Sequence, residues 1–228
     1  VLGDGASYRV YPFPAESPKE TDQILLVDPS DVIASPLGWH DTDDMEGAEF
    51  TITRGNNVHA YHDLNNTNNS SGTEPDGGDD LVFDFIHDDS NDPLNNIVSA
   101  QVNLFYANNY IHDFTYHLGF DEAAGNFQQN NYNNEGIGND AVNAHALDGF
   151  NLYIPGVQDS LFINNANFST PGDGGSGRMQ MYLWNNPGES TFATITAPAQ
   201  IAADLPAGNP DWGFPINEGD APVSGKAV

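Results

Sequence analysis

The chain of 228 residues contains no cysteine, and it has only 5 lysines and arginines against 33 aspartates and glutamates. The absence of cysteine excludes a disulfide scaffold, a thiolate zinc site and a cysteine nucleophile. The formal net charge of −28 repels phosphate backbones and anionic lipid headgroups, which excludes nucleic acid and the membrane surface as partners. The sequence has no apolar run of about 18 residues, so it predicts no membrane-spanning helix.

Hydrophobic residues make up 38% of the chain and include 13 Phe, 9 Tyr and 3 Trp, which indicates a folded domain with a sizeable core. The first residues have neither the basic nor the apolar segment of a signal peptide, as expected of a mature chain whose leader has been removed. The excess of carboxylates is typical of a salt-adapted host, of bound calcium ions, or of both.

One long segment has helical periodicity, and we expect a helix near residues 93–118. Asp92 is a favourable N-cap, Pro93 suits the first helical position, and Gly119 suits the end. Two apolar stripes follow this segment, so the helix is expected to be covered on two sides. One stripe is Leu104, Ala107, Ile111, Phe114 and Leu118; the second is Val98, Val102, Phe105, Asn109, His112 and Tyr116.

Short alternating segments predict β-strands at residues 8–13, 81–87, 140–149, 164–168 and 178–184, and a pair of strands over residues 48–65 that turns at Gly55-Asn56-Asn57. The fold class expected is therefore α+β: a twisted antiparallel β-sheet packed on one long central helix. After Trp184 the composition changes to small residues and prolines. We predict one domain over residues 1–188 and a linker with the start of a β-rich insertion over 189–228, and we expect the polypeptide to continue.

Three long segments resemble the fungalysin metallopeptidases, a secreted branch of the thermolysin-like zinc proteases. They are TRGNNVHAYHD, NLFYANNYIHDFTYHLGFDEAAGNFQQNNYNNEGIGNDAV and NNANFSTPGDGGSGRMQMYLW, in that order. The resemblance implies a secreted, extracellular zinc endopeptidase that hydrolyses proteins and peptides. The tail from about Phe192 resembles the beginning of a protease-associated domain, which some bacterial members insert at this point.

The zinc-binding motif that this family needs, His-Glu-x-x-His on a helix, is absent from the sequence. None of the histidines lies in that pattern; they are His40, His59, His62, His87, His112, His117 and His145. In the family the motif lies beyond the Met-x-Met-Tyr-x-Trp strand. We therefore expect the chain to be a cleft-wall portion with no catalytic residue, which is inactive alone and depends on zinc held by the rest of the same polypeptide.

The extended run from Asn164 to Phe168 is too polar for a core strand and uncharged, which favours an edge strand that binds another backbone. The resemblance implies a substrate-binding role for Asn164, Asn165, Ala166 and Phe168. Asn165 would contact a peptide through its side-chain amide and Ala166 through its main-chain carbonyl, while Phe168 would support the wall. The alternative is that these asparagines cap turns and bond only to nearby backbone.

Two acidic loops have the oxygen density that calcium favours, although neither follows the EF-hand pattern. The predicted calcium ligands are Asp76, Asp79, Asp80, Asp88 and Asp89, and the alternative is a solvated acidic surface. His59 and His62 are near Asp63 in sequence, but positions three apart on a strand face opposite sides, so surface histidines are expected there.

His112 is expected to be a buried core histidine, and Asp113 to pair with His117 one helical turn later. A second function class stays open beside the enzyme part. It is a non-enzymatic secreted module, derived from the same scaffold, that binds calcium or peptide.

Overall fold

A computed structural model of the chain describes residues 3–15, 18, 20–45, 47–88, 90–154, 159–184, 191–195 and 203–207. The chain divides into two compact units, Val1–Asn185 and Asn186–Val228. In the second unit, strands β8 (Thr191–Ile195) and β9 (Ala203–Ala207) pair antiparallel. The assignment of the tail to the start of an inserted domain stays a prediction.

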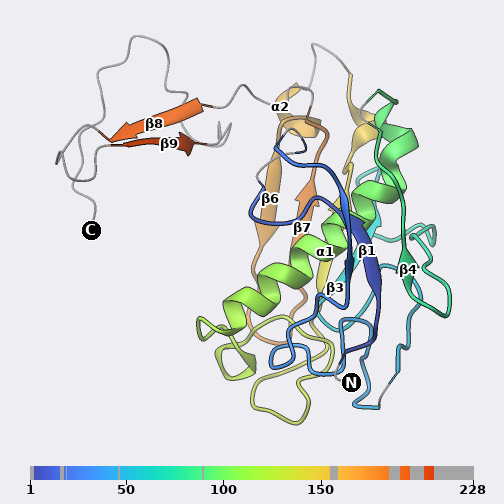
Figure 1. The fold of residues 1–228 in the computed structure, drawn as a ribbon, viewed down its shortest axis with the longest axis vertical. Coiled ribbons are helices and arrows are strands. Elements are labelled where there is room, and N and C mark those ends of the chain that lie inside the picture. The colour runs from blue at the N-terminus through green and yellow to red at the C-terminus, as the bar shows by residue number, and fades with distance from the viewer. Residues whose placement is uncertain are drawn as a thin grey trace. The chain divides into compact units, whose positions relative to one another are not determined.

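The first unit is built from two sheets and one long helix, α1 (Figure 1). The three-stranded sheet has the order β2 (Ile24–Val27), β1 (Ser7–Val10), β4 (Val82–Phe83). The four-stranded sheet has the order β3 (Val58–His62), β5 (Val142–Ala146), β7 (Arg178–Met181), β6 (Ala166–Ser169). The α+β class is confirmed.

Strand pairing is mixed and not antiparallel throughout. In the three-stranded sheet β1 runs antiparallel to β2 and parallel to β4. In the four-stranded sheet β3 and β5 are parallel, β5 and β7 are parallel, and β6 runs antiparallel to β7. Parallel neighbours need a long crossover connection, and α1 lies in the connection between β3 and β5. In the strand pair predicted over 48–65, the second half forms β3, whereas the first half makes only isolated bridges, from Ile52 to Asp76 and from Arg54 to His59.

Helix α1 spans Ile97–Tyr116 and follows a 3₁₀ turn at Pro93–Asn96, close to the predicted bounds. The Asp92 side chain accepts a hydrogen bond from the Leu94 amide, as an N-cap should. Gly119 has a left-handed φ of +95°, which suits the end of the helix. The other short helical segments described are Glu122–Ala124, Phe150–Leu152 and α2 at Asp159–Phe162.

The stripe of α1 that contains Val102 and Phe105, hereafter the inner stripe, packs into the core through these two fully buried residues. Tyr8 and Phe83 of the three-stranded sheet stack with ring centroids 5.3 Å apart, and Tyr8 lies 5.8 Å from Phe105. Burying each such side chain contributes about 1.5–3 kcal/mol. This core fixes α1 against β1, β3 and β5.

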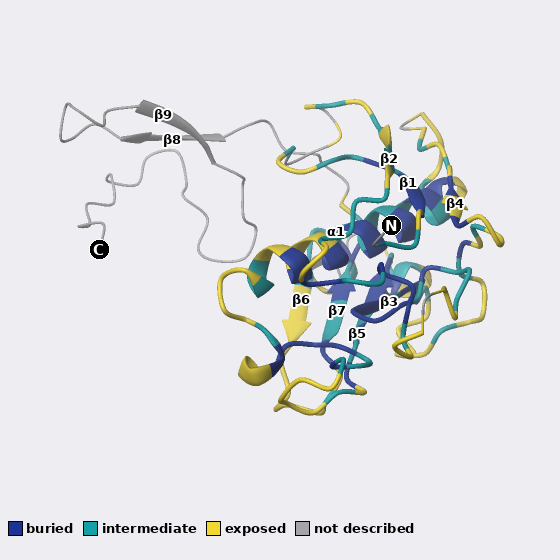
Figure 2. Cartoon of the chain, turned by 60° about the horizontal axis from the view of Figure 1, so that its bottom comes forward, coloured by how far each residue is buried: buried dark blue, intermediate teal, exposed yellow. Residues whose placement is uncertain are grey.

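The other stripe of α1, hereafter the outer stripe, was also expected to be covered. Leu104 at its start packs against the core, but its C-terminal residues are exposed in the described part of the chain. Ile111, Phe114 and Leu118 are 45%, 57% and 72% exposed. Figure 2 shows the same change along the helix, from buried turns to exposed ones. Within that described part, no helix has both the length and the apolar character needed to cross a bilayer.

Candidate substrate-binding edge

β6 forms an edge of the four-stranded sheet, with β7 as its partner on one side. The amide of Tyr182 donates to the carbonyl of Asn165 at 3.3 Å. Because alternate residues of an antiparallel strand direct their backbone groups to opposite sides, Ala166 and Phe168 direct N–H and C=O away from β7. Figure 2 shows the strand as the exposed border of its sheet.

The two asparagines before β6 differ in their roles. Asn164 has a left-handed φ of +50°, and its backbone N–H donates to the Leu183 carbonyl at 2.7 Å, so it helps to form the local turn. Asn165 is half-buried, and its side-chain amide makes no hydrogen bond with any residue that the structure describes. The turn-capping alternative therefore fits Asn164 better than Asn165.

Phe168 lies on the face of the sheet that α1 covers. Its register partner on β7 is Met179, and Asn108 of α1 contacts the Met179 sulfur at 3.4 Å. The Phe168 ring lies 5.8 Å from the ring of Phe127. Gly177 allows this packing, because a Cβ there would come within 2.9 Å of the Phe168 ring. Phe168 therefore supports the strand from behind and stays 43% exposed.

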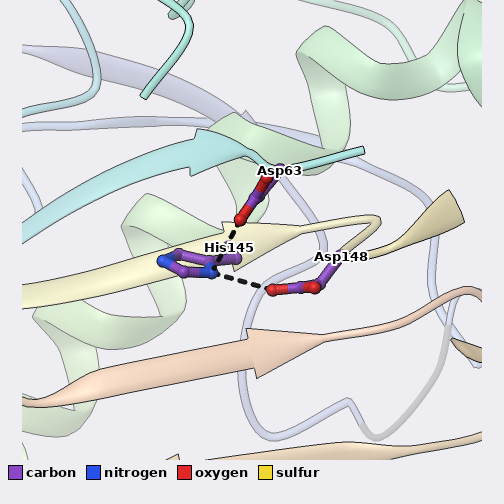
Figure 3. A group of neighbouring side chains, drawn as sticks. All are labelled: Asp63, His145 and Asp148. Atoms are coloured by element: carbon purple, nitrogen blue, oxygen red, sulfur yellow. Dashed lines mark hydrogen bonds and ion pairs between the residues drawn. The ribbon is translucent and has the colours of Figure 1, made fainter. Parts of the chain in front are cut away.

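A buried polar network lies at the ends of β3 and β5 (Figure 3). His145 Nδ1–H donates to Asp148 Oδ2 at 2.8 Å and lies 3.7 Å from Asp63 Oδ2. Tyr61 Oη lies 2.8 Å from His145 Nε2, and Gln180 of β7 donates to Asp148 at 2.7 Å. The network therefore links β3, β5 and β7. β7 is the strand with which β6 pairs.

The three carboxylate and imidazole groups of this network are close enough to hold an ion, but within the described residues most of their atoms already have hydrogen-bond partners, Asp148 Oδ1 being the exception. The Asp63 oxygens already accept bonds from Thr67 and Asn68, and the imidazole is already bonded to Asp148. Burial, followed by the charges of Asp63 and Asp148, raises the pKa of Tyr61 to about 12, so its hydroxyl stays protonated.

Sequence reasoning missed this network because it grouped Asp63 with nearby histidines. The signal that could have revealed it was the pair His145 and Asp148, three residues apart at the end of a predicted strand, which can hydrogen-bond to each other. His59 and His62 do not converge: His59 lies 2.6 Å from Glu74, whereas His62 faces the hydroxyls of Ser71 and Thr73. His59 is not the surface histidine that the sequence predicted, because its side chain is only 19% exposed.

The prediction for His112 is confirmed, because its side chain is buried and lies 3.0 Å from Asp113 Oδ1. The predicted pairing of Asp113 with His117 is wrong. His117 lies 3.0 Å from Asp31, whereas Asp113 points into the protein toward Ser35 and Trp39. The buried donors compete successfully for this carboxylate, because an unpaired buried donor is more costly than an exposed pair.

The predicted calcium ligands serve as turn formers or lie on the surface. Asp76 accepts from the Gly78 amide, and Asp88 accepts from Ser90 and Asn91. Asp79 and Asp80 are exposed. Asp89 lies outside the described residues. No cluster of three close ligand atoms in the described part of the chain includes any of the other four, and the calcium role of the five stays a prediction.

Comparison with known proteins identifies the family. The family model described as "Fungalysin metallopeptidase (M36)" matches residues 7–207, which is most of the chain. The chain therefore belongs to the fungalysin metallopeptidase family.

Its relatives include proteins named as extracellular metalloproteinases. "Extracellular metalloproteinase 2" of Phaeosphaeria nodorum is 39% identical over 203 residues, which is 86% of this chain and 29% of that protein. "Extracellular metalloproteinase 1" of Arthroderma otae is 37% identical over 84% of this chain and 29% of its own length. "Extracellular metalloproteinase MEP" of Pyricularia oryzae is 39% identical over 78% of this chain and 26% of its own length. The chain thus spans less than a third of the length of these curated relatives.

Proposed function

We propose that this chain is the cleft-wall portion of a secreted, extracellular zinc metalloendopeptidase that hydrolyses proteins and peptides. The observation that carries the proposal is the edge strand β6, whose Ala166 and Phe168 backbone groups point away from β7. The family match and the names of the extracellular relatives support the reaction class.

The edge binds substrate by strand addition. An extended peptide aligned beside β6 pairs its backbone with the outward N–H and C=O groups, and this pairing does not depend on the peptide's side chains. Asn165 adds a side-chain amide next to that backbone. An amide both donates and accepts, so it suits the peptide group of any residue. The strand therefore positions a peptide without imposing a strict sequence.

The catalytic zinc is held elsewhere in the same polypeptide. A catalytic zinc needs three protein ligands and an open position for water or substrate. Among the described residues, the His145 group is the one metal-sized cluster with a histidine, and its atoms are bonded to one another in a closed interior. These residues do not fit a catalytic zinc, so no reaction step is assigned to them.

The outer stripe of α1 is a surface on which the rest of the polypeptide, including the zinc-helix region, docks. Its exposed Ile111, Phe114 and Leu118 form an apolar face on a helix whose other face is fully packed. Such a face is costly to leave in water. The chain matches only 29% of the length of two relatives, which supports the rest of a longer polypeptide as the part that docks here. We also propose that the second unit begins a protease-associated insertion.

The 228-residue chain by itself is expected to show no peptidase activity, because it carries neither the zinc ligands nor a positioned general base. The measurement is casein turnover by the purified chain with and without added zinc. Turnover that is abolished by a point substitution within this chain would contradict the expectation. Extended-peptide binding without turnover, in a protein whose coding sequence does not continue to a zinc motif, would favour the non-enzymatic module.

In the full-length enzyme, Asn165→Ala is expected to lower kcat/KM for peptides several-fold to about tenfold. A hydrogen bond to a neutral partner contributes about 0.5–1.5 kcal/mol, and 1.4 kcal/mol is a tenfold change. The effect should grow with substrate length, because each added residue extends the strand pairing. Steady-state kinetics on a series of peptides of increasing length measures it.

The matched control for this experiment is Asn69→Ala, which removes an amide from an exposed loop position. Thermal unfolding should show the Asn165 variant as stable as the parent, since this amide bonds to no described residue. Should the Asn165 variant lose stability and keep its kcat/KM, the residue is structural and the proposed role fails.

A further inference from the structure

A second carboxylate cluster lies far from the edge strand in sequence, in the loop that follows Trp39 and His40. Asp41, Asp43 and Glu49 each offer one oxygen, and these oxygens all lie within 4.8 Å of one another. None of the three is among the calcium ligands predicted from the sequence. Clustering of acidic groups alone is common on a protein surface, so the cluster requires a second observation.

Asp41 provides that observation. Its side chain is 0% exposed, and neither carboxylate oxygen has a hydrogen-bond partner among the described residues. The amides of Asp43 and Asp44 are close enough to influence it, but neither makes a hydrogen bond of standard geometry. A buried carboxylate without a partner is costly, and proteins normally supply a donor or a cation. The Asp63 group is better satisfied, because Asp148 Oδ1 is its one buried carboxylate oxygen without a partner in the described residues, whereas both oxygens of Asp41 have none.

The electrostatics agree with this geometry. Burial, and next the charge of Glu49, raises the pKa of Asp41 to about 6 against the lowering effect of the two amides. The carboxylate is therefore disfavoured as an anion but still mostly ionised at neutral pH. Like charges this close repel, and a cation placed between them removes both the repulsion and the unsatisfied oxygens.

A second buried oxygen lies within electrostatic reach of the cluster. No described residue gives the buried hydroxyl of Tyr132 a hydrogen-bond partner. Its pKa is raised, first by burial and then by the charges of Asp41, Asp44 and Glu49. The segment that carries it is tied to the acidic loop, because Asn130 donates to the Thr42 carbonyl and Asn133 donates to Asp44, each at 3.3 Å. Two loops distant in sequence therefore meet at the cluster, in which Asp41 is buried while Asp43 and Glu49 are exposed.

We propose that Asp41, Asp43 and Glu49 bind one calcium ion, with the Tyr132 hydroxyl as a neutral oxygen beside them. All the donor atoms are oxygens. Zinc and copper prefer nitrogen and sulfur ligands, so this site favours a hard cation instead. Calcium accepts irregular carboxylate arrangements from flexible loops, whereas magnesium requires a near-ideal octahedron. The ion joins the 41–49 loop to the 130–133 segment and so stabilises the folded state.

The direct test is equilibrium dialysis of the full-length protein against radioactive calcium at roughly 0.1–1 mM, the range of extracellular sites. Asp41→Asn is expected to reduce the bound calcium by one ion per chain. The matched control is Asp79→Asn, the same change at an exposed residue predicted from sequence as a ligand. It should leave the count unchanged. An unchanged count for Asp41→Asn overturns the proposal, and a loss confined to Asp79→Asn moves the site to the other loop.

Thermal unfolding provides a second readout that a purely structural Asp41 would not produce. Calcium at 100-fold above its Kd should raise the Tm of the parent by roughly 5–10 °C. In Asp41→Asn this increase should be largely lost, whereas the calcium-free Tm should equal or exceed that of the parent, because a buried unpaired charge has been removed. If Asp41→Asn fails to fold, Glu49→Gln at an exposed position replaces it. A full calcium response in the variant overturns the proposal.

Discussion

Asp113→Ala is expected to lower the free energy of unfolding by about 3–5 kcal/mol, the cost of breaking a buried charged network. Asp113 lies near the end of α1 and is 6% exposed. Its carboxylate accepts from Ser35 Oγ at 2.7 Å, Trp39 Nε1 at 2.8 Å and the Asp31 amide at 3.0 Å. The substitution leaves these donors without an acceptor in a region that excludes water.

The loss should lower the Tm by roughly 10 °C, given 2–4 °C per kcal/mol for a domain of this size. The measurement is urea or thermal unfolding followed by tryptophan fluorescence, to which the buried Trp39 contributes together with the other two tryptophans. Asp80→Ala is the control, because Asp80 is exposed and the change should stay within about 0.5 kcal/mol. A similar small change for Asp113→Ala would mean that this carboxylate does not hold the 31–39 segment against α1.

Phe114→Asp is expected to lower the free energy of unfolding much more in the full-length protein than in the 228-residue chain. If the rest of the polypeptide covers the outer stripe, the aspartate buries an unpaired charge there, which costs 3 kcal/mol or more. In the chain alone Phe114 is 57% exposed, so the same change should cost about 0.5 kcal/mol or less. Denaturant titrations of both proteins, with and without the substitution, measure the difference.

Ile86→Asp is the matched control, because Ile86 is also a large apolar residue, is 75% exposed and lies outside α1. It should cost little in either protein. Equal, small costs for Phe114→Asp in both proteins would show that the outer stripe stays in water and that the continuation of the chain docks elsewhere. The result is independent of the edge strand, so it tests the domain assembly and not substrate binding.

The local elements followed from the sequence, because their signals lie within a few residues of one another. The Asp92-Pro93 start and the Gly119 end delimited α1 closely. Polarity marked the segment that became β6, and its place at a sheet edge agrees with that pattern. Long segments of family-like sequence also sufficed to indicate the fungalysin metallopeptidases before any geometry was known.

The tertiary structure decided which partners these elements have. Periodicity showed two apolar stripes on α1, but only packing distinguished the buried inner stripe from the exposed outer one. Asp113 was expected to bond one turn along its own helix, yet its partners lie some 80 positions earlier in the chain. The same holds for Asp63 with His145, and for the Asp41 loop with Tyr132. Such contacts leave no local pattern, because they depend on which segments the fold brings together and on how much water it excludes there.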